Sequence, residues 1–180
     1  MNMKDAMSSQ VINPSNDAGI DRGKQFIPNN KNEIYHALAQ PADAKALAPN
    51  ISQADREDIE AAYGKSLDTF LLEHCSSDER RPTVWIRGDD ALGMCGLIEH
   101  NGQPHIWMVA RDDYQVALPQ WLRWPLQNGS LLFGPLNAIT RSNREGRRAL
   151  FKSLGMSFVG IDTGGAVYQY DYSGKHILEN

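Results

Sequence analysis

The feature that most constrains the fold is a helix followed by two strands near the end of the chain. Ser142 and Glu145 have the spacing of a capping box, in which each side chain satisfies an amide at a helix start. Apolar residues at helical spacing follow, and Gly155 suits the left-handed position just past a helix end. Residues 156–161 then predict a short buried strand, and residues 166–172 predict a second strand after a turn.

The preceding residues add helices and strands to this unit. Three segments have capping or apolar patterns typical of helices: residues 52–63, residues 67–75, and a short helix over 118–127 that stops near Pro125. Four segments are strand-like: residues 83–87, 92–99, 106–110 and, bent by Gly134 and Pro135, 131–139. Residues 32–40 fit a short helix or a strand. This order predicts an α/β or α+β domain with one mixed, mostly antiparallel sheet flanked by helices on both faces.

The first 32 residues differ from the rest of the chain. They are polar, rich in Asn, Gly and Pro, and without periodicity, which predicts an extended arm in front of a single domain over residues 33–180. The arm carries isolated apolar residues: Val11, Ile12, Ile20, Phe26 and Ile27. Two interpretations stay open, a disordered tail and an arm that docks on a partner protein through these apolar residues.

Composition excludes several functional classes. The net charge of -4 and the isoelectric point near 5.7 argue against bulk affinity for nucleic acid. No apolar run approaches the roughly 20 residues that cross a bilayer, so no membrane partner is expected. Cys75 and Cys95 have neither metal-site spacing nor a disulfide framework, which predicts a reducing environment and no bound metal.

Residues 140–158, reading TRSNREGRRALFKSLGMSF, resemble the penultimate helix and following strand of the GNAT (GCN5-related N-acetyltransferase) fold. The resemblance extends over roughly residues 33–172. Among GNAT-like chains, the hairpin with Gly93 and the run Ile106–Val109 is similar to that of the small internal virion proteins of T7-like podophages. This resemblance implies a bacteriophage protein of the virion, made in the host bacterial cytoplasm, that binds other virion proteins in a symmetric assembly.

The GNAT resemblance also implies an acetyl-CoA site, and the residues at its expected positions depart from the family. The family binds the cofactor's pyrophosphate with a glycine-rich loop at a helix start. The corresponding segment, Arg111–Pro119, has no glycine and carries Asp112 and Asp113, which would repel phosphates. The position of the family's tyrosine general acid holds Phe151, which has no proton to donate. Asn143 would bond the cofactor's pantetheine arm if acetyl-CoA binds, or would cap the helix.

The remaining polar and aromatic residues are expected mainly to have structural roles. Glu99 and His100 are expected to be solvated beside a turn, His105 to be a surface or stacking residue, and His74 to lie in the core. The tryptophans at 107, 121 and 124 are core or interface candidates. The helix near the end of the chain carries five basic residues: Arg141, Arg144, Arg147, Arg148 and Lys152. They predict a solvated face, an anion site, or a surface for the acidic patch of a protein partner, which is favoured over DNA.

The sequence thus predicts a non-catalytic GNAT-like virion or virion-assembly protein, internal or portal-associated, with no catalytic residue and no cofactor. The partner-binding residues would be the five apolar residues of the arm together with Arg141, Arg144, Arg147 and Arg148. Whether the chain is an enzyme stays open. The alternatives are an acetyl-CoA-dependent N-acetyltransferase with a degenerate cofactor loop and a phage effector that binds a host protein.

Overall fold

The computed structural model describes residues 33–77, 80–141, 145–162 and 165–172. Within them the chain forms one seven-stranded sheet of order β1-β2-β3-β4-β5-β7-β6. Neighbouring strands are antiparallel except for β4 and β5, which are parallel. The strands are β1 (Ile34–Leu38), β2 (Thr83–Arg87), β3 (Asp90–His100), β4 (Gln103–Ala110), β5 (Leu136–Thr140), β6 (Ser157–Asp162) and β7 (Gly165–Tyr170).

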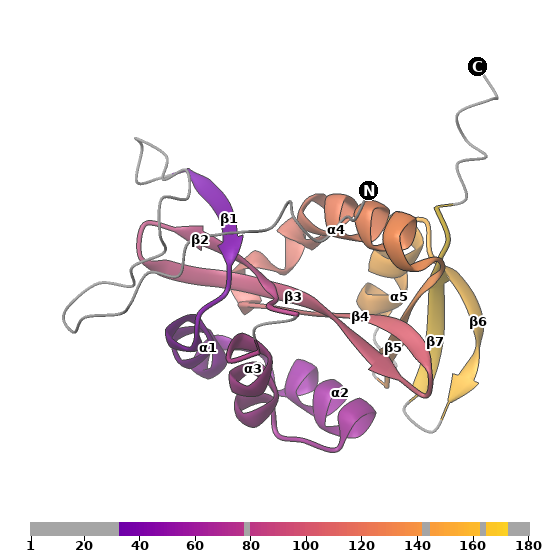
Figure 1. Cartoon of the computed structure of the whole chain (residues 1–180), viewed down its shortest axis with the longest axis horizontal. Helices are drawn as coiled ribbons and strands as arrows, with labels where there is room; N and C mark the ends of the chain where they lie inside the picture. The colour runs from indigo at the N-terminus through magenta and orange to yellow at the C-terminus, as the bar shows by residue number, and fades with distance from the viewer. Residues whose placement is uncertain (1–32, 78–79, 142–144, 163–164, 173–180) are drawn as a thin grey trace, which may run out of the picture.

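Helices cover both faces of this sheet, as Figure 1 shows. One face packs against α1 (Pro41–Leu47), α2 (Gln53–Tyr63) and α3 (Leu67–Cys75), and the other packs against α4 (Leu118–Phe133) and α5 (Glu145–Ser153). Two short 3₁₀ helices, η1 (Ala48–Asn50) and η2 (Asp112–Ala117), follow α1 and precede α4. Each face has its own apolar core, which confirms the predicted fold class of a mixed sheet flanked by helices.

Local signals set the boundaries of the first helices. The Ser52 hydroxyl accepts a hydrogen bond from the Asp55 amide at 3.1 Å, so α2 begins with the predicted cap. The Ser66 hydroxyl caps α3 in the same way through the Thr69 amide. Residues 32–40, open between helix and strand in the sequence, contain the edge strand β1.

The prediction for α4 was wrong at its end. The helix does not stop near Pro125 but continues to Phe133, so residues 131–133 are helical and the strand β5 begins only at Leu136. The physical reason is a continuous buried face, formed by Leu118, Leu122 and Leu126 and continued by the buried Gly129 and Ser130. Burial of this face offsets the roughly 3 kcal/mol that an interior proline costs a helix.

The strand β6 forms where expected but is not buried. Its side chains Phe158, Val159 and Ile161 are 57%, 52% and 83% exposed. As the last strand of the sheet, β6 pairs with β7 alone. The preceding Gly155 has φ of +78°, the left-handed conformation predicted at this helix exit.

Candidate functional site

The candidate site is the gap between the parallel strands β4 and β5. The two strands are in register at one pair only, His105 with Asn137. Beyond that pair, the run Ile106–Ala110 of β4 bonds to β3 on one side and has no strand partner on the side facing β5. In open α/β sheets, ligands bind at the carboxyl ends of neighbouring parallel strands, so the gap between this one parallel pair is the candidate place for a ligand.

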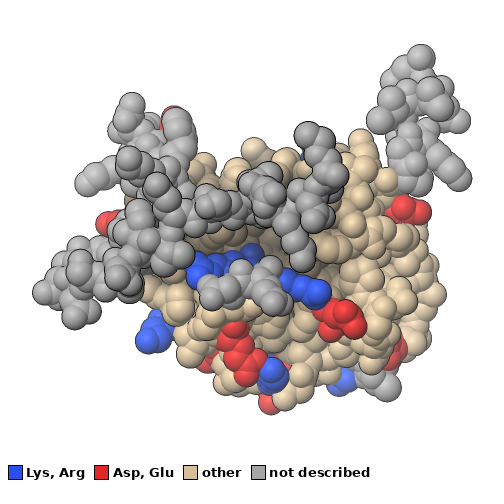
Figure 2. Space-filling model, viewed as in Figure 1, with Lys and Arg blue, Asp and Glu red and all other residues tan. Residues whose placement is uncertain are grey.

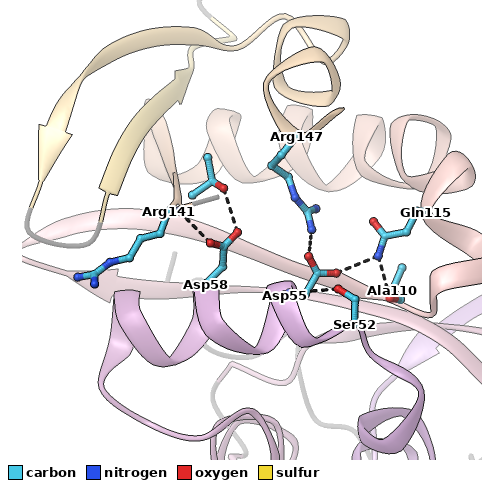
Figure 3. A network of polar contacts seen from close by, with 8 residues as sticks. Ser52, Asp55, Asp58, Ala110, Gln115, Arg141 and Arg147 are labelled. Carbon is cyan, nitrogen blue, oxygen red and sulfur yellow. Dashed lines mark hydrogen bonds and ion pairs between the residues drawn. The ribbon is translucent and has the colours of Figure 1, made fainter. Parts of the chain in front are cut away.

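A buried ion pair fills the gap. Asp55 on α2 and Arg147 on α5 come from helices on opposite faces of the sheet, and their carboxylate and guanidinium meet between the strands, as Figure 3 shows. The two side chains are only 3% and 9% exposed. The Gln115 amide nitrogen donates to Asp55 Oδ2 at 2.9 Å and to the Ala110 carbonyl at 3.0 Å. The last free carbonyl of β4 is therefore occupied from within the chain.

A second carboxylate of α2 holds the end of β5. Asp58 Oδ2 accepts from the Thr140 hydroxyl and Asp58 Oδ1 accepts from the Arg141 amide, both at 2.9 Å (Figure 3). Asp55 and Asp58 are three residues apart and so lie on the same side of the helix. Together they connect α2 to η2, α5 and β5 around the gap.

What space remains is small. A cavity of about 30 Å³ lies between α2, the two strands and α5, and Trp107, Thr140 and Arg147 are among its lining residues. Within the described part of the chain, Trp107 Nε1 and Arg147 Nη1 are buried without a hydrogen-bond partner. This volume fits about one water molecule and is far below that of a cofactor site.

The segment before α4 does not suit a pyrophosphate either. Residues 112–117 form the 3₁₀ helix η2 in place of an open loop, and Arg111 is held by two hydrogen bonds of 3.1 Å to the Asp113 carboxylate. The first amide of α4, at Leu118, bonds to the Gln115 carbonyl, and Pro119 has no amide. Because phosphate sites at helix starts need free amides and no opposing carboxylates, the residues present do not fit coenzyme A.

The predicted basic surface is divided by the structure. Arg147 lies in the internal ion pair rather than on an exposed face, whereas Arg148 is exposed. Arg141 is also exposed, and its backbone amide is used by Asp58. Asn143 and Arg144 lie outside the described residues, as do the five apolar residues predicted as anchors, Val11, Ile12, Ile20, Phe26 and Ile27.

The structure decides between the two roles expected for His105 and corrects the one expected for His100. His105 is not at the surface: it is 3% exposed, and its ring lies 5.1 Å from that of His100, so it has the stacking role. Burial, helped by the neighbouring His100, lowers the pKa of His105 to about 4. His100 is not fully solvated either, because it packs edge-on against Tyr63 and its Nε2 lies 3.8 Å from Asp162. The reason is that the hairpin end between β3 and β4 is covered by α2 and by the end of β6.

Most of the other predicted roles agree with the structure. Phe151 is buried against Tyr168, and Trp107 and Trp121 lie in the two cores, while Trp124 is 61% exposed. His74, predicted to lie in the core, is only half-buried, and its Nδ1 lies 2.8 Å from the Phe70 carbonyl oxygen.

The cysteines supply no reactive group. Cys75 and Cys95 are free and buried, and burial raises the pKa of each thiol to about 12, far from the range of a nucleophile. Among the described residues, no group of His, Cys, Asp and Glu side chains has the arrangement of a metal site. In the same part of the chain, no helix is long and apolar enough to cross a membrane.

Comparison with known proteins identifies solved structures that share this architecture. No protein-family model and no curated protein matches the sequence. Solved structures do match: a GNAT-family acetyltransferase from Bacillus anthracis has a TM-score of 0.58 at 13% identity, over 77% of this chain and 94% of that one. The GNAT domain of S. lividans PAT has a TM-score of 0.59 at 11% identity, over 76% of this chain and 89% of that domain.

A third match was solved in complex with coenzyme A. It is the PaiA N-acetyltransferase from Thermoplasma acidophilum, with a TM-score of 0.56 at 9% identity, over 78% of this chain and 99% of that one. Nothing in the comparisons supports the predicted similarity to virion proteins. At these identities the likeness concerns architecture, and it confirms the prediction made for it: this chain has the GNAT fold.

Proposed function

We propose that this GNAT-fold chain acts by binding another protein and does not transfer acyl groups from acyl-CoA. The observation that carries the proposal is the ion pair of Asp55 and Arg147 in the gap between β4 and β5. A ligand in that gap must separate two buried charges. Leaving one buried charge without its partner costs about 3–5 kcal/mol, which corresponds to roughly a hundred-fold to several-thousand-fold loss of affinity.

The approach to the gap supports the same proposal. Asp112 and Asp113 precede α4, where the family resemblance implies a phosphate-binding loop, and the Arg111 guanidinium is already paired with Asp113. Phe151 occupies the position implied for a proton donor and is buried in the core. These residues therefore argue against both the binding of an acyl-CoA and the completion of acyl transfer at the positions that the family resemblance implies.

The second candidate is an acetyl-CoA-dependent N-acetyltransferase. The similarity to acetyltransferase structures, one of them in complex with coenzyme A, favours it. On the comparisons alone this candidate has better support than a virion role, and neither the virion role nor that of a phage effector has support of its own there.

One assay separates the two candidates. The full chain is incubated with acetyl-CoA and amine acceptors of several classes, namely polyamines, polylysine and peptides with free N-termini, and release of the CoA thiol is followed. We expect the native protein to release the CoA thiol no faster than a heat-denatured sample does. A rate that rises in proportion to native protein would instead establish the acetyltransferase.

A further inference from the structure

The strand β3 is longer than its neighbour β2 and leaves part of its edge unpaired. The paired residues of the two strands extend from Arg87 opposite Asp90 to Thr83 opposite Cys95, while β3 continues to His100. Residues 96–100 therefore pair with β4 on one side and with no strand of the described chain on the other. Burial changes at the same point, since residues 91–95 are buried and residues 96–100 are half-buried or exposed.

This free edge presents hydrogen-bonding groups of the backbone. In an antiparallel strand, alternate residues direct both N–H and C=O toward the same neighbour, so an unpaired edge exposes donors and acceptors in turn. Apart from the pairing with β4, no backbone hydrogen bond within the described part of the chain involves residues 96–100. Such an edge is a template for another extended segment.

A groove lies beside the edge on the face covered by α4. Its volume is about 450 Å³, and Cys95, Leu97 and Ile106 form its floor. The last three turns of α4 form the wall, where Trp124, Leu132 and Phe133 are 61%, 76% and 56% exposed. An apolar groove of this size between a helix and a sheet is typical of a binding site.

A second, smaller cavity lies beside the same edge on the face covered by α3. Its volume is about 170 Å³, and its lining residues include Glu73 and His74 from the end of α3 and Ser77 just after it. Leu97, Ile98 and Arg80 line both cavities. The two cavities thus lie on opposite faces of the sheet beside the same stretch of edge. Because successive side chains of a strand point to opposite faces, those of an added strand would point alternately into the two cavities.

We propose that the edge at residues 96–100 binds an extended segment of a partner protein as an additional strand. This deepens the proposed binding role by naming its surface. The backbone of the segment pairs with β3, its apolar side chains enter the groove under α4, and its polar side chains face the α3 cavity. Arg80 is exposed, and no ion pair of its side chain occurs in the described part of the chain. Because Glu73 is paired with Lys65, Arg80 favours an acidic residue among the polar positions.

The probe is a short acetylated, fluorescently labelled peptide in which valine alternates with glutamate, and binding to the full chain is measured by fluorescence anisotropy. We expect saturable binding. Leu132→Asp, which places a charge in the groove wall, should weaken it at least about tenfold. The matched control is Leu131→Asp, on the same turn and 63% exposed but outside the groove, which should change it less than about twofold. Arg80→Glu should weaken binding about fivefold.

Two N-methylated peptides test the strand pairing itself. Methyl groups on alternate amides block one edge of the peptide, so one of the two possible sets should abolish binding and the other should leave it intact. Equal binding of both would overturn strand addition, as would equal effects of the two leucine variants or no binding up to about 1 mM. Binding seen only after deletion of residues 1–32 would assign the edge to this chain's own arm and contradict the proposal. None of these results depends on the acetyl-transfer assay, so each proposal can fail alone.

Discussion

At the scale of single residues, the pair of Asp55 and Arg147 is the main determinant of the candidate site. Burying two charges costs desolvation energy, which is recovered only when the pair has good geometry and further hydrogen bonds. Asp55 has such a bond from Gln115, and its own amide is used by Ser52. The result is a closed gap between β4 and β5 that also fastens α5 to α2.

Arg147→Ala is therefore expected to destabilise the protein by about 3–5 kcal/mol, because it leaves the Asp55 carboxylate buried and unpaired. The measurement is the free energy of unfolding in urea. Arg148→Ala, on the same helix but exposed, is the control and should change stability by less than about 0.5 kcal/mol. Equal effects of the two substitutions would show that Arg147 is solvated in solution.

His105 predicts a dependence of stability on pH. Burial first, and then the neighbouring His100, lowers its pKa to about 4, from 6.5 for a free histidine, while Asp162 acts in the opposite direction. Below pH 6.5 the unfolded chain binds this proton and the folded chain does not, so stability falls as pH falls toward 4. Between pH 7 and pH 5 the loss from this residue is about 2 kcal/mol.

The check is urea unfolding of wild type and His105→Gln over that pH range. The difference between the two proteins should narrow toward acid pH, because only the wild type loses the contribution of His105. A constant difference would mean that His105 takes up its proton equally in both states.

At the scale of elements, the sequence predicted those set by local chemistry. The capping serine and apolar period of α2, and the whole of α3 and β2, agree with the structure because their signals lie within a few residues. The end of α4 and the exposure of β6 could not be predicted in this way. Both depend on which neighbours the sheet supplies, and Pro125 gave a local signal that burial of the helix face outweighed.

The candidate site likewise has features that the sequence predicts and features that it does not. The acidic residues before α4 and the missing proton donor at Phe151 were visible in the sequence. The ion pair was not, because Asp55 and Arg147 are 92 residues apart. The one local signal of the ion pair is the spacing of Asp55 and Asp58, which puts two carboxylates on one side of a helix. For Arg147 the sequence predicts a basic surface shared with its neighbours, because nothing near it in the chain indicates a buried partner.

The docking of α5 can also be tested through its buried aromatic side chain. Phe151→Ala should cost about 3–5 kcal/mol, since Phe151 is 2% exposed and packs against Tyr168 on β7. Thermal unfolding of the two variants is the measurement. The control, Lys152→Ala at the next and exposed position, should leave stability nearly unchanged. An unchanged melting temperature for Phe151→Ala would place this side chain in solvent.

At the scale of the whole molecule, residues 33–172 contain all seven strands and both apolar cores. Deleting residues 1–32 should therefore leave the melting temperature nearly unchanged, as measured by circular dichroism. Loss of the cooperative transition in the truncated protein would mean that these residues belong to the core.

The central claim is that a GNAT fold is present here with its cofactor gap closed. Isothermal titration of the full chain with acetyl-CoA tests it most directly. We predict no binding tighter than about 1 mM, because a ligand would have to separate Asp55 from Arg147 and meet Asp112 and Asp113 at its phosphates. A dissociation constant in the micromolar range would contradict the claim and identify the gap as a working acyl-CoA site.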